Sequence, residues 1–292
     1  MRYSIPLRWA DLDAQGHANN ARVVDYLQEA RVRYLLQGDN AHLLGAGVVV
    51  VAHQVEYSGA IEFTPEPLEV DLRVGEVGAS RFTIGYELAQ AGRPVGRART
   101  HLCIFDFDTQ RPARLKPPER ASLTADSEHL EPFRSLGAWR VGEAAHEFSL
   151  AVRWSDLDSY GHVNNTRFYE YLGEARVAMT SSLMPRAIRS GMDAAGESAW
   201  LVARQDLHYH AQLEHRLEPY RVRTAVGHVG RTSLTLAAEI VDPVDATVHA
   251  RATTVLVHSD PLGRPTPVPD AVRAAASRWP ALHGRAGKAA TR

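Results

Sequence analysis

The spacing of apolar residues along the chain changes in an order that occurs twice. Near the N-terminus, a short and partly alternating stretch at 3–9 predicts a strand. Beyond residue 20, apolar side chains recur every three or four positions, which predicts one long amphipathic helix with a single buried face. The residues of that face are Val23, Val24, Leu27, Ala30, Tyr34 and Leu35. β-Branched and alternating segments then predict four strands, at 48–57, 69–75, 81–89 and 95–107.

The second half of the chain predicts the same elements, beginning with a strand at 148–154 and a helix at 166–183 that ends before Pro185. Matching residues lie 145 positions apart up to the helix and 152 positions apart beyond it, as Gly75 and Gly227 show. The difference between these offsets places a seven-residue insertion around 184–196.

The two halves also share residue identity. Residues 8–31 read RWADLDAQGHANNARVVDYLQEAR and residues 153–176 read RWSDLDSYGHVNNTRFYEYLGEAR, with 15 of 24 positions identical. Identity at this density indicates an internal duplication. The predicted organisation is a first domain at 1–110, a linker at 111–143, a second domain at 144–270 and a disordered tail at 271–292.

The lengths of the connections between elements limit which folds are possible. The segments between successive predicted strands are short, which favours antiparallel pairing, because parallel strands need long crossover segments. One long helix per half packs most naturally against a face of its own sheet. The sequence therefore predicts an α+β chain of two similar domains, each a curved antiparallel sheet wrapped around one long helix.

Composition excludes several classes of function. The formal net charge is −1, so no overall attraction to nucleic acid or to a membrane surface is expected. Cys103 is the single cysteine, which rules out an internal disulfide and favours a reducing compartment. No apolar run reaches the length of a signal peptide or a membrane span. We therefore expect a soluble, cytoplasmic protein.

The candidate chemistry lies in the polar segments Asp11–Asn20 and Asp156–Asn165, directly before each predicted helix. Each segment holds two aspartates, a glycine, a histidine and two asparagines within ten residues. A helix N-terminus carries unpaired amides and a partial positive charge, which suits the polarisation of a carbonyl group. Glycine at 16 and 161 would let the backbone approach a substrate closely.

The pattern D-x-D-x-x-G-H-x-N-N at the start of a helix, followed by four strands, resembles the hotdog-fold acyl thioesterases. The family includes 4-hydroxybenzoyl-CoA thioesterase and the plant and bacterial acyl-acyl-carrier-protein (acyl-ACP) thioesterases. The similarity covers roughly 1–110 and 147–260, and the second copy is especially similar to the plant enzymes, which are tandem hotdogs. The resemblance implies two tandem hotdog domains that hydrolyse acyl-CoA or acyl-ACP to free acid and thiol, without a metal or redox cofactor.

The resemblance also implies roles for individual residues. Asp13 and Asp158 stand at the family's catalytic aspartate and would act as general base or nucleophile. The histidines would assist water activation or bind the substrate, and the first asparagine of each pair would orient water or the aspartate. The expected catalytic residues are Asp158, His162, Asn164, Asp13, His17 and Asn19, and the expected substrate-binding residues are Gly16, Gly161, Tyr160, Asn20 and Asn165. The plant-type pattern has asparagine where this chain has Gln15 and Tyr160, which separates it from the detailed plant mechanism.

Structural roles compete with these assignments. Aspartate before a helix commonly binds its own turn, and asparagine commonly caps the helix. The histidines could hold the loop, and the pairs Glu29/Arg31 and Glu174/Arg176 favour ion pairing on the helix surface. Trp9 and Trp154 are expected in the core or in the wall of an acyl pocket. A metal site formed by His208, His210, Glu214 and His215 has little support, because Glu56 and Ser58 occupy the matching positions of the first half.

Two other functions remain open from the sequence. One is a hotdog hydratase or dehydratase acting on enoyl or 3-hydroxyacyl thioesters, and the other is a non-catalytic acyl-thioester binding or sensor protein. The expected partners are the thioester substrate and a further copy of the chain, with no nucleic acid. Of the two motifs, the second has the bulkier aromatic surroundings and the closer match to H-V-N-N, so Asp158 is the preferred catalytic residue.

Overall fold

The computed structural model describes residues 1–13, 16–37, 40–183 and 198–284. The chain divides into two compact units, 1–133 and 134–292. The predicted insertion at 184–196 lies outside the described residues, as do Gln15 and the last eight residues of the predicted tail.

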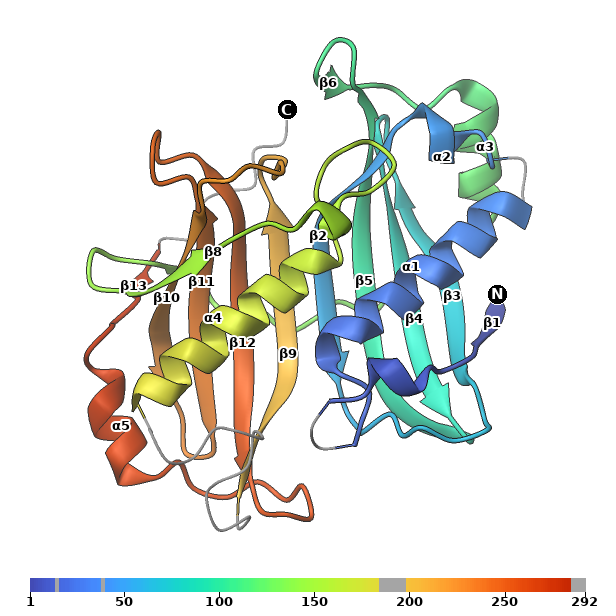
Figure 1. The fold of residues 1–292 in the computed structure, drawn as a ribbon. Coiled ribbons are helices and arrows are strands. Elements are labelled where there is room, and N and C mark those ends of the chain that lie inside the picture. The colour runs from blue at the N-terminus through green and yellow to red at the C-terminus, as the bar shows by residue number, and fades with distance from the viewer. Residues whose placement is uncertain (14–15, 38–39, 184–197, 285–292) are drawn as a thin grey trace. The chain divides into compact units, whose positions relative to one another are not determined.

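The first unit contains one five-stranded antiparallel sheet and one long helix (Figure 1). Its strands lie in the order β1-β3-β4-β5-β2, and the short β6 pairs with β5. The elements are β1 (Arg2–Ile5), a 3₁₀ turn (Trp9–Asp11), α1 (Asn20–Gln37), α2 (Leu43–Ala46), β2 (Val48–Tyr57), β3 (Leu68–Val77), β4 (Arg81–Gln90), β5 (Arg93–Asp106), β6 (Arg111–Pro112) and α3 (Pro117–Ala125).

The second unit repeats this arrangement, with its sheet in the order β8-β10-β11-β12-β9 and a separate pair formed by β13 and β7. The elements are β7 (Trp139–Arg140), β8 (His146–Leu150), a 3₁₀ turn (Trp154–Asp156), α4 (Arg167–Leu183), β9 (Ala199–Tyr209), β10 (Tyr220–Val229), β11 (Ser233–Val241), β12 (Val248–Ser259), α5 (Asp270–Ala276) and β13 (Leu282–His283). The predicted α+β architecture, one long helix against one antiparallel sheet in each half, is confirmed.

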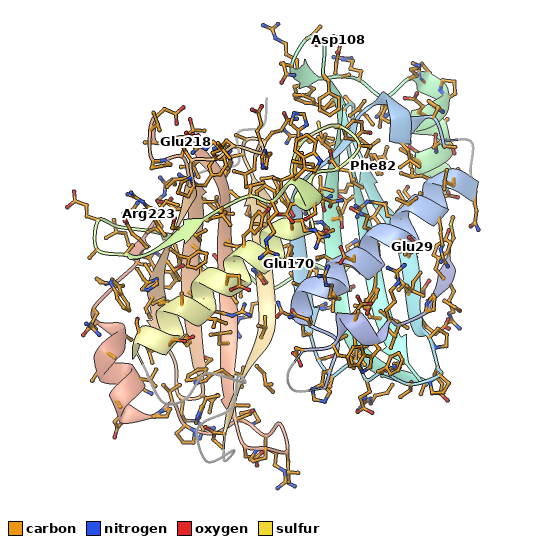
Figure 2. All side chains as sticks on the ribbon, viewed as in Figure 1. Glu29, Phe82, Asp108, Glu170, Glu218 and Arg223 are labelled. Atoms are coloured by element: carbon orange, nitrogen blue, oxygen red, sulfur yellow. The ribbon has the colours of Figure 1, made fainter. Side chains whose placement is uncertain are left out.

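The core of each unit lies between the long helix and the sheet, as Figure 1 shows for α1 and α4. The predicted apolar face of α1 is buried at every position, from Val23 to Leu35. Inward-facing strand residues complete the core, among them Phe82, which is 1% exposed (Figure 2). Burial of side chains of this size stabilises the fold by roughly 1.5–3 kcal/mol each.

The first strand of each repeat is shorter than predicted. β1 and β8 end at Ile5 and Leu150, and the matching tryptophans of the two repeats instead begin 3₁₀ turns. Trp9 is 74% exposed and Trp154 is 75% exposed, so neither belongs to the core. The other predicted position, in the wall of a pocket, agrees with the structure for Trp154, which lines a pocket of the second unit. The turns carry both rings outward, away from the helix and sheet.

The predicted surface ion pair of Glu29 and Arg31 needs correction. Glu29 is exposed on α1 and pairs with Arg33 at 2.9 Å (Figure 2). Arg31 is only 5% exposed and donates to the hydroxyl of Tyr86 at 3.3 Å. Its guanidinium faces the sheet because it shares the buried side of the helix with Leu27 and Leu35, one turn away on either side.

Each repeat continues into a short helix that the sequence analysis assigned to linker or tail. α3 and α5 lie at matching positions, with Pro118 and Asp270 separated by the same offset of 152. Leu123 of α3 is fully buried and Val272 of α5 is 1% exposed. The predicted disorder from residue 271 onward is therefore wrong over α5. The error arises because a helix of two turns has too few apolar positions to show a period, so its burial depends on the surface it meets.

α3 is joined by polar contacts to the long helix α1 and to the residue that precedes α2. The hydroxyl of Tyr34 donates to Asp126 at 2.9 Å, and the His42 ring lies 2.7 Å from the Glu119 carboxylate. The chain then forms a parallel bridge from Ser127 to β3, and the second unit has the matching bridge from Pro280 to β10. Among the described residues, no helix has the length and apolar character needed to span a bilayer.

Candidate active site

A pocket of about 530 Å³ opens beside the motif loop of the second unit. Three segments form it: the 3₁₀ turn, the loop that leads to α4, and the chain that follows β9. The lining residues are Trp154, Leu157, Asp158, Ser159, Gly161, His162, Glu214 and His215. The pocket thus gathers two carboxylates and two imidazoles, of which Asp158 and His162 are the catalytic pair predicted from the motif.

The loop closes on itself by backbone hydrogen bonds. The amide of Asp158 donates to the carbonyl of His162 at 2.7 Å, and the amide of Gly161 donates to the carbonyl of Asp158 at 3.1 Å. Gly161 has a φ of +79°, a conformation that residues with a Cβ rarely adopt, and Gly16 has the same φ. The glycine of the motif is therefore required by this tight turn.

The carboxylate of Asp158 is positioned by its own turn. Its Oδ1 accepts hydrogen bonds from the amides of Tyr160 at 2.9 Å and His162 at 3.4 Å. The structural interpretation and the catalytic one are thus compatible, because the same bonds that stabilise the turn orient the carboxylate at the pocket. Tyr160 lies outside the pocket lining, and burial together with the charge of Asp158 raises the pKa of its hydroxyl.

The other aspartate of the motif attaches the loop to the helix. Asp156 is 7% exposed and accepts a hydrogen bond from the Tyr171 hydroxyl at 2.7 Å and another from the amide of Arg153 at 2.9 Å. Burial and the Asp156 bond raise the pKa of Tyr171 far above its ordinary value, so the phenol remains the donor. Asp11 and Tyr26 form the same bond in the first unit, at 2.9 Å.

The first asparagine of each pair acts as a helix cap. The Oδ1 atoms of Asn19 and Asn164 accept hydrogen bonds from the amides of Ala21 at 2.9 Å and Thr166 at 3.0 Å. The capping role proposed from the sequence is confirmed for these two residues, while a direct role in catalysis stays a prediction. For Asn20 and Asn165, the structure places their carbonyls as acceptors of the Tyr57 and Tyr209 hydroxyls.

Four amides at the start of α4 already have acceptors within the chain. Those of Val163 and Asn164 donate to the carbonyls of Leu213 and Asp156, and those of Thr166 and Arg167 donate to Asn164. These four amides therefore do not bind an oxyanion in this conformation. What the helix start offers the pocket is the partial positive charge at the N-terminal end of its dipole.

Glu214 and His215 are the site residues that motif reasoning missed. The sequence analysis placed them only in a weak metal cluster with His208 and His210, and no group of metal-ligating side chains occurs among the described residues. The Tyr220 hydroxyl lies 3.3 Å from both the amide nitrogen and the carbonyl oxygen of Glu214, which holds this residue in place. A comparison of the repeats at offset 152 matches Glu214 with Glu62 but His215 with Phe63, so it offers a signal for the glutamate alone. In the structure, Leu213 and Ile61 accept hydrogen bonds from the two motif segments in the same way, which brings both residues beside the loop.

The first unit forms the same loop with different surroundings. The amides of Asp13 and Gly16 donate to the carbonyls of His17 at 2.8 Å and Asp13 at 3.0 Å. Glu62 matches Glu214, but its carboxylate lies 3.7 Å from the Arg93 guanidinium. Phe63 occupies the position of His215. The two motifs are thus alike in backbone and differ in the segment beside them.

Solved structures of known proteins share the fold of this chain. The putative oleoyl thioesterase from Lactobacillus plantarum is similar over 92% of this chain and 96% of its own, with 15% identity and a TM-score of 0.68. The 12:0-ACP thioesterase from Umbellularia californica is similar over 89% and 94%, with 16% identity and a TM-score of 0.69. An acyl-ACP thioesterase from Bacteroides thetaiotaomicron is similar over 88% of this chain and 96% of its own, with 14% identity and a TM-score of 0.63.

Because these identities are low, the similarity to solved structures shows a shared fold and nothing further. None of the curated protein sequences matches this chain. The family model described as the thioesterase-like superfamily matches residues 7–123 and 152–276, which include both motifs, the four long strands of each sheet and most or all of α3 and α5. This protein therefore belongs to the thioesterase-like superfamily and consists of two tandem hotdog domains.

Proposed function

We propose that this protein is an acyl thioesterase that hydrolyses acyl-CoA or acyl-ACP to free acid and thiol. The observation that carries the proposal is the pocket of the second repeat, in which the oriented carboxylate of Asp158 faces the same space as His162 and Glu214. Membership of the thioesterase-like superfamily supports this class of reaction.

The proposed reaction needs water alone as co-substrate. Asp158 acts as general base towards the water, or as nucleophile towards the thioester carbonyl. As the new C–O bond forms, the positive end of α4 stabilises the developing oxyanion. On the general-base route the C–S bond then breaks, and the thiolate leaves with the proton taken from water. On the nucleophilic route the thiolate leaves first, and water then hydrolyses the acyl-Asp158 anhydride, which releases the acid, regenerates the carboxylate and supplies the proton for the thiol. His162 hydrogen-bonds the water or the substrate, and Glu214 supplies a second acceptor for the proton.

The remaining motif residues have supporting roles in this proposal. Asn164 caps α4 and so fixes the distance between the helix start and Asp158. The path of the substrate is bordered by Gly161, Tyr160 and Asn165. In the first repeat, the matching residues are Gly16 and Asn20. Asp13, His17 and Asn19 form the matching constellation there.

The first experiment is free-thiol release from a panel of acyl-CoAs, from acetyl to palmitoyl with benzoyl and phenylacetyl, and from the corresponding acyl-ACPs. We expect steady turnover with at least one member, and the ranking of rates gives the acyl group and the carrier. Crotonyl-CoA serves as the control for a hydratase, since hydration removes the enoyl absorbance without releasing thiol. Folded protein that releases no thiol from any thioester would contradict the proposal.

The hydrogen bond between Tyr171 and Asp156 has an equivalent in the first repeat, so removing each bond in turn compares the contributions of the two repeats to turnover. Tyr171→Phe leaves a buried carboxylate without its phenol donor, so the free energy of unfolding should fall by about 1–3 kcal/mol. Because Asp158 lies two residues further along the loop, kcat should also fall about tenfold. Tyr26→Phe removes the same bond from the first repeat and should cost similar stability with kcat preserved. Equal losses of kcat in the two variants would show that both loops contribute to turnover.

A further inference from the structure

The pocket of the second repeat contains an imidazole that the first repeat lacks. His215 lines this pocket, whereas Phe63 stands at the matching position and is 48% exposed. The neighbouring glutamate is present in both repeats, as Glu214 and Glu62. The difference between the repeats at this point is therefore the presence of an imidazole, whose two ring nitrogens can accept and donate a proton.

Both residues beside His215 contact the same tyrosine, Glu214 through its backbone and Arg216 through its side chain. The Tyr220 hydroxyl binds the amide and the carbonyl of Glu214, both at 3.3 Å. The Arg216 guanidinium lies 3.8 Å above the centre of the Tyr220 ring and donates to Asp242. A side chain between two anchored residues is restricted before any substrate binds, which is the condition for efficient proton transfer.

The ring of His215 has a defined neighbour as well. It meets the indole of Trp154 edge to face, with centroids 5.4 Å apart and planes at 84°. Trp154 is itself 75% exposed, so this contact lies at the open side of the pocket, not in the core. The other titratable groups of the pocket are Asp158, His162 and Glu214.

We propose that His215 is a proton-transfer residue of the second repeat, and that this repeat alone turns over substrate; the inference rests on the proposed thioesterase function. Asp158 takes one proton from the attacking water as the water oxygen bonds to the acyl carbon, and that proton passes to the imidazole of His215. The C–S bond breaks, and the departing thiolate receives that proton from the imidazolium. The products are the free acid and the thiol, and the neutral imidazole is regenerated.

The alternative is that His215 serves only as an aromatic wall beside Trp154. His215→Phe separates the two roles, because phenylalanine is the residue of the first repeat and keeps an edge-to-face contact with the indole. His215→Ala opens space for added imidazole, which can restore proton transfer but not a packing contact. Phe63→Ala removes the matching ring from the first repeat and is the control for general effects of truncation.

The test measures thiol release from the best substrate of the panel, with the folded state of each variant checked by its thermal unfolding. For His215→Phe we expect kcat to fall about 100-fold or more with KM within about threefold of the wild type. Added imidazole should raise kcat of His215→Ala, and Phe63→Ala should match the wild type.

Three outcomes would overturn the inference. If His215→Phe keeps the wild-type kcat, His215 has no part in proton transfer. A loss of activity in folded His215→Ala that imidazole does not restore would assign it a packing role. A wild type that hydrolyses no thioester would overturn the proposed function and this inference together, whereas the first two outcomes leave the proposed function standing.

Discussion

Replacement of Asp158 by asparagine is expected to lower kcat about 10³-fold, a loss of about 4 kcal/mol of transition-state stabilisation. The amide oxygen of asparagine can still accept the hydrogen bonds that Asp158 receives from the amides of Tyr160 and His162. The loop should therefore keep its conformation while the group that acts on the water or the carbonyl is lost. Thiol release under saturating substrate, with the unfolding temperature measured in parallel, checks both parts of the expectation.

Asp13→Asn is the matched control, because the first repeat holds its motif loop by the same backbone bonds. If only the second repeat is catalytic, this variant should retain wild-type kcat. An Asp158→Asn variant that keeps about half of the activity, with the rest lost on further replacement of Asp13, would show instead that both repeats turn over. Full activity in Asp158→Asn would exclude the catalytic role of this carboxylate.

Leu123→Ala is expected to lower the free energy of unfolding by about 2–5 kcal/mol. Leu123 of α3 is fully buried, and removal of three carbon atoms leaves a cavity that the surrounding helix and sheet fill only in part. The measurement is denaturant unfolding of the whole chain, followed by circular dichroism. A linker residue in the same position would give no change, so this variant decides whether α3 belongs to the first repeat.

Leu262→Ala provides the comparison for Leu123→Ala. Leu262 lies in a turn and is 74% exposed, so its truncation should change the free energy of unfolding by less than about 0.5 kcal/mol. Similar values for the two leucines would contradict the buried position of α3. A large effect at Leu123 alone would confirm that the first repeat extends into its short helix.

Local patterns predicted the parts of the fold whose burial is periodic. The face of α1 from Val23 to Leu35 is buried as predicted, because helical spacing brings those residues to one side whatever they later meet. The strands matching β2 and β4 were placed within a residue or two for the same reason. The motif loop was also identified from sequence, since both copies keep the residues that its turn requires.

Only half of the candidate site could be predicted from a local sequence pattern. Asp158 and His162 lie in one continuous motif, so a repeat of that motif indicates them directly. Glu214 and His215 are more than fifty residues away along the chain and enter the pocket only because the segment after β9 pairs with the motif loop through Leu213. No local pattern connects these two segments.

By itself, then, the sequence determined the duplication, the helix and sheet of each repeat, and the loop that carries Asp158. Tertiary structure alone decided that α3 and α5 pack onto their repeats, that Trp9 and Trp154 face outward, and that His215 lies at the pocket. The reason is the distance along the chain over which each effect acts. Periodicity and turn chemistry act between residues a few positions apart, whereas the burial of a short helix or of a single ring depends on which distant surface the chain brings against it.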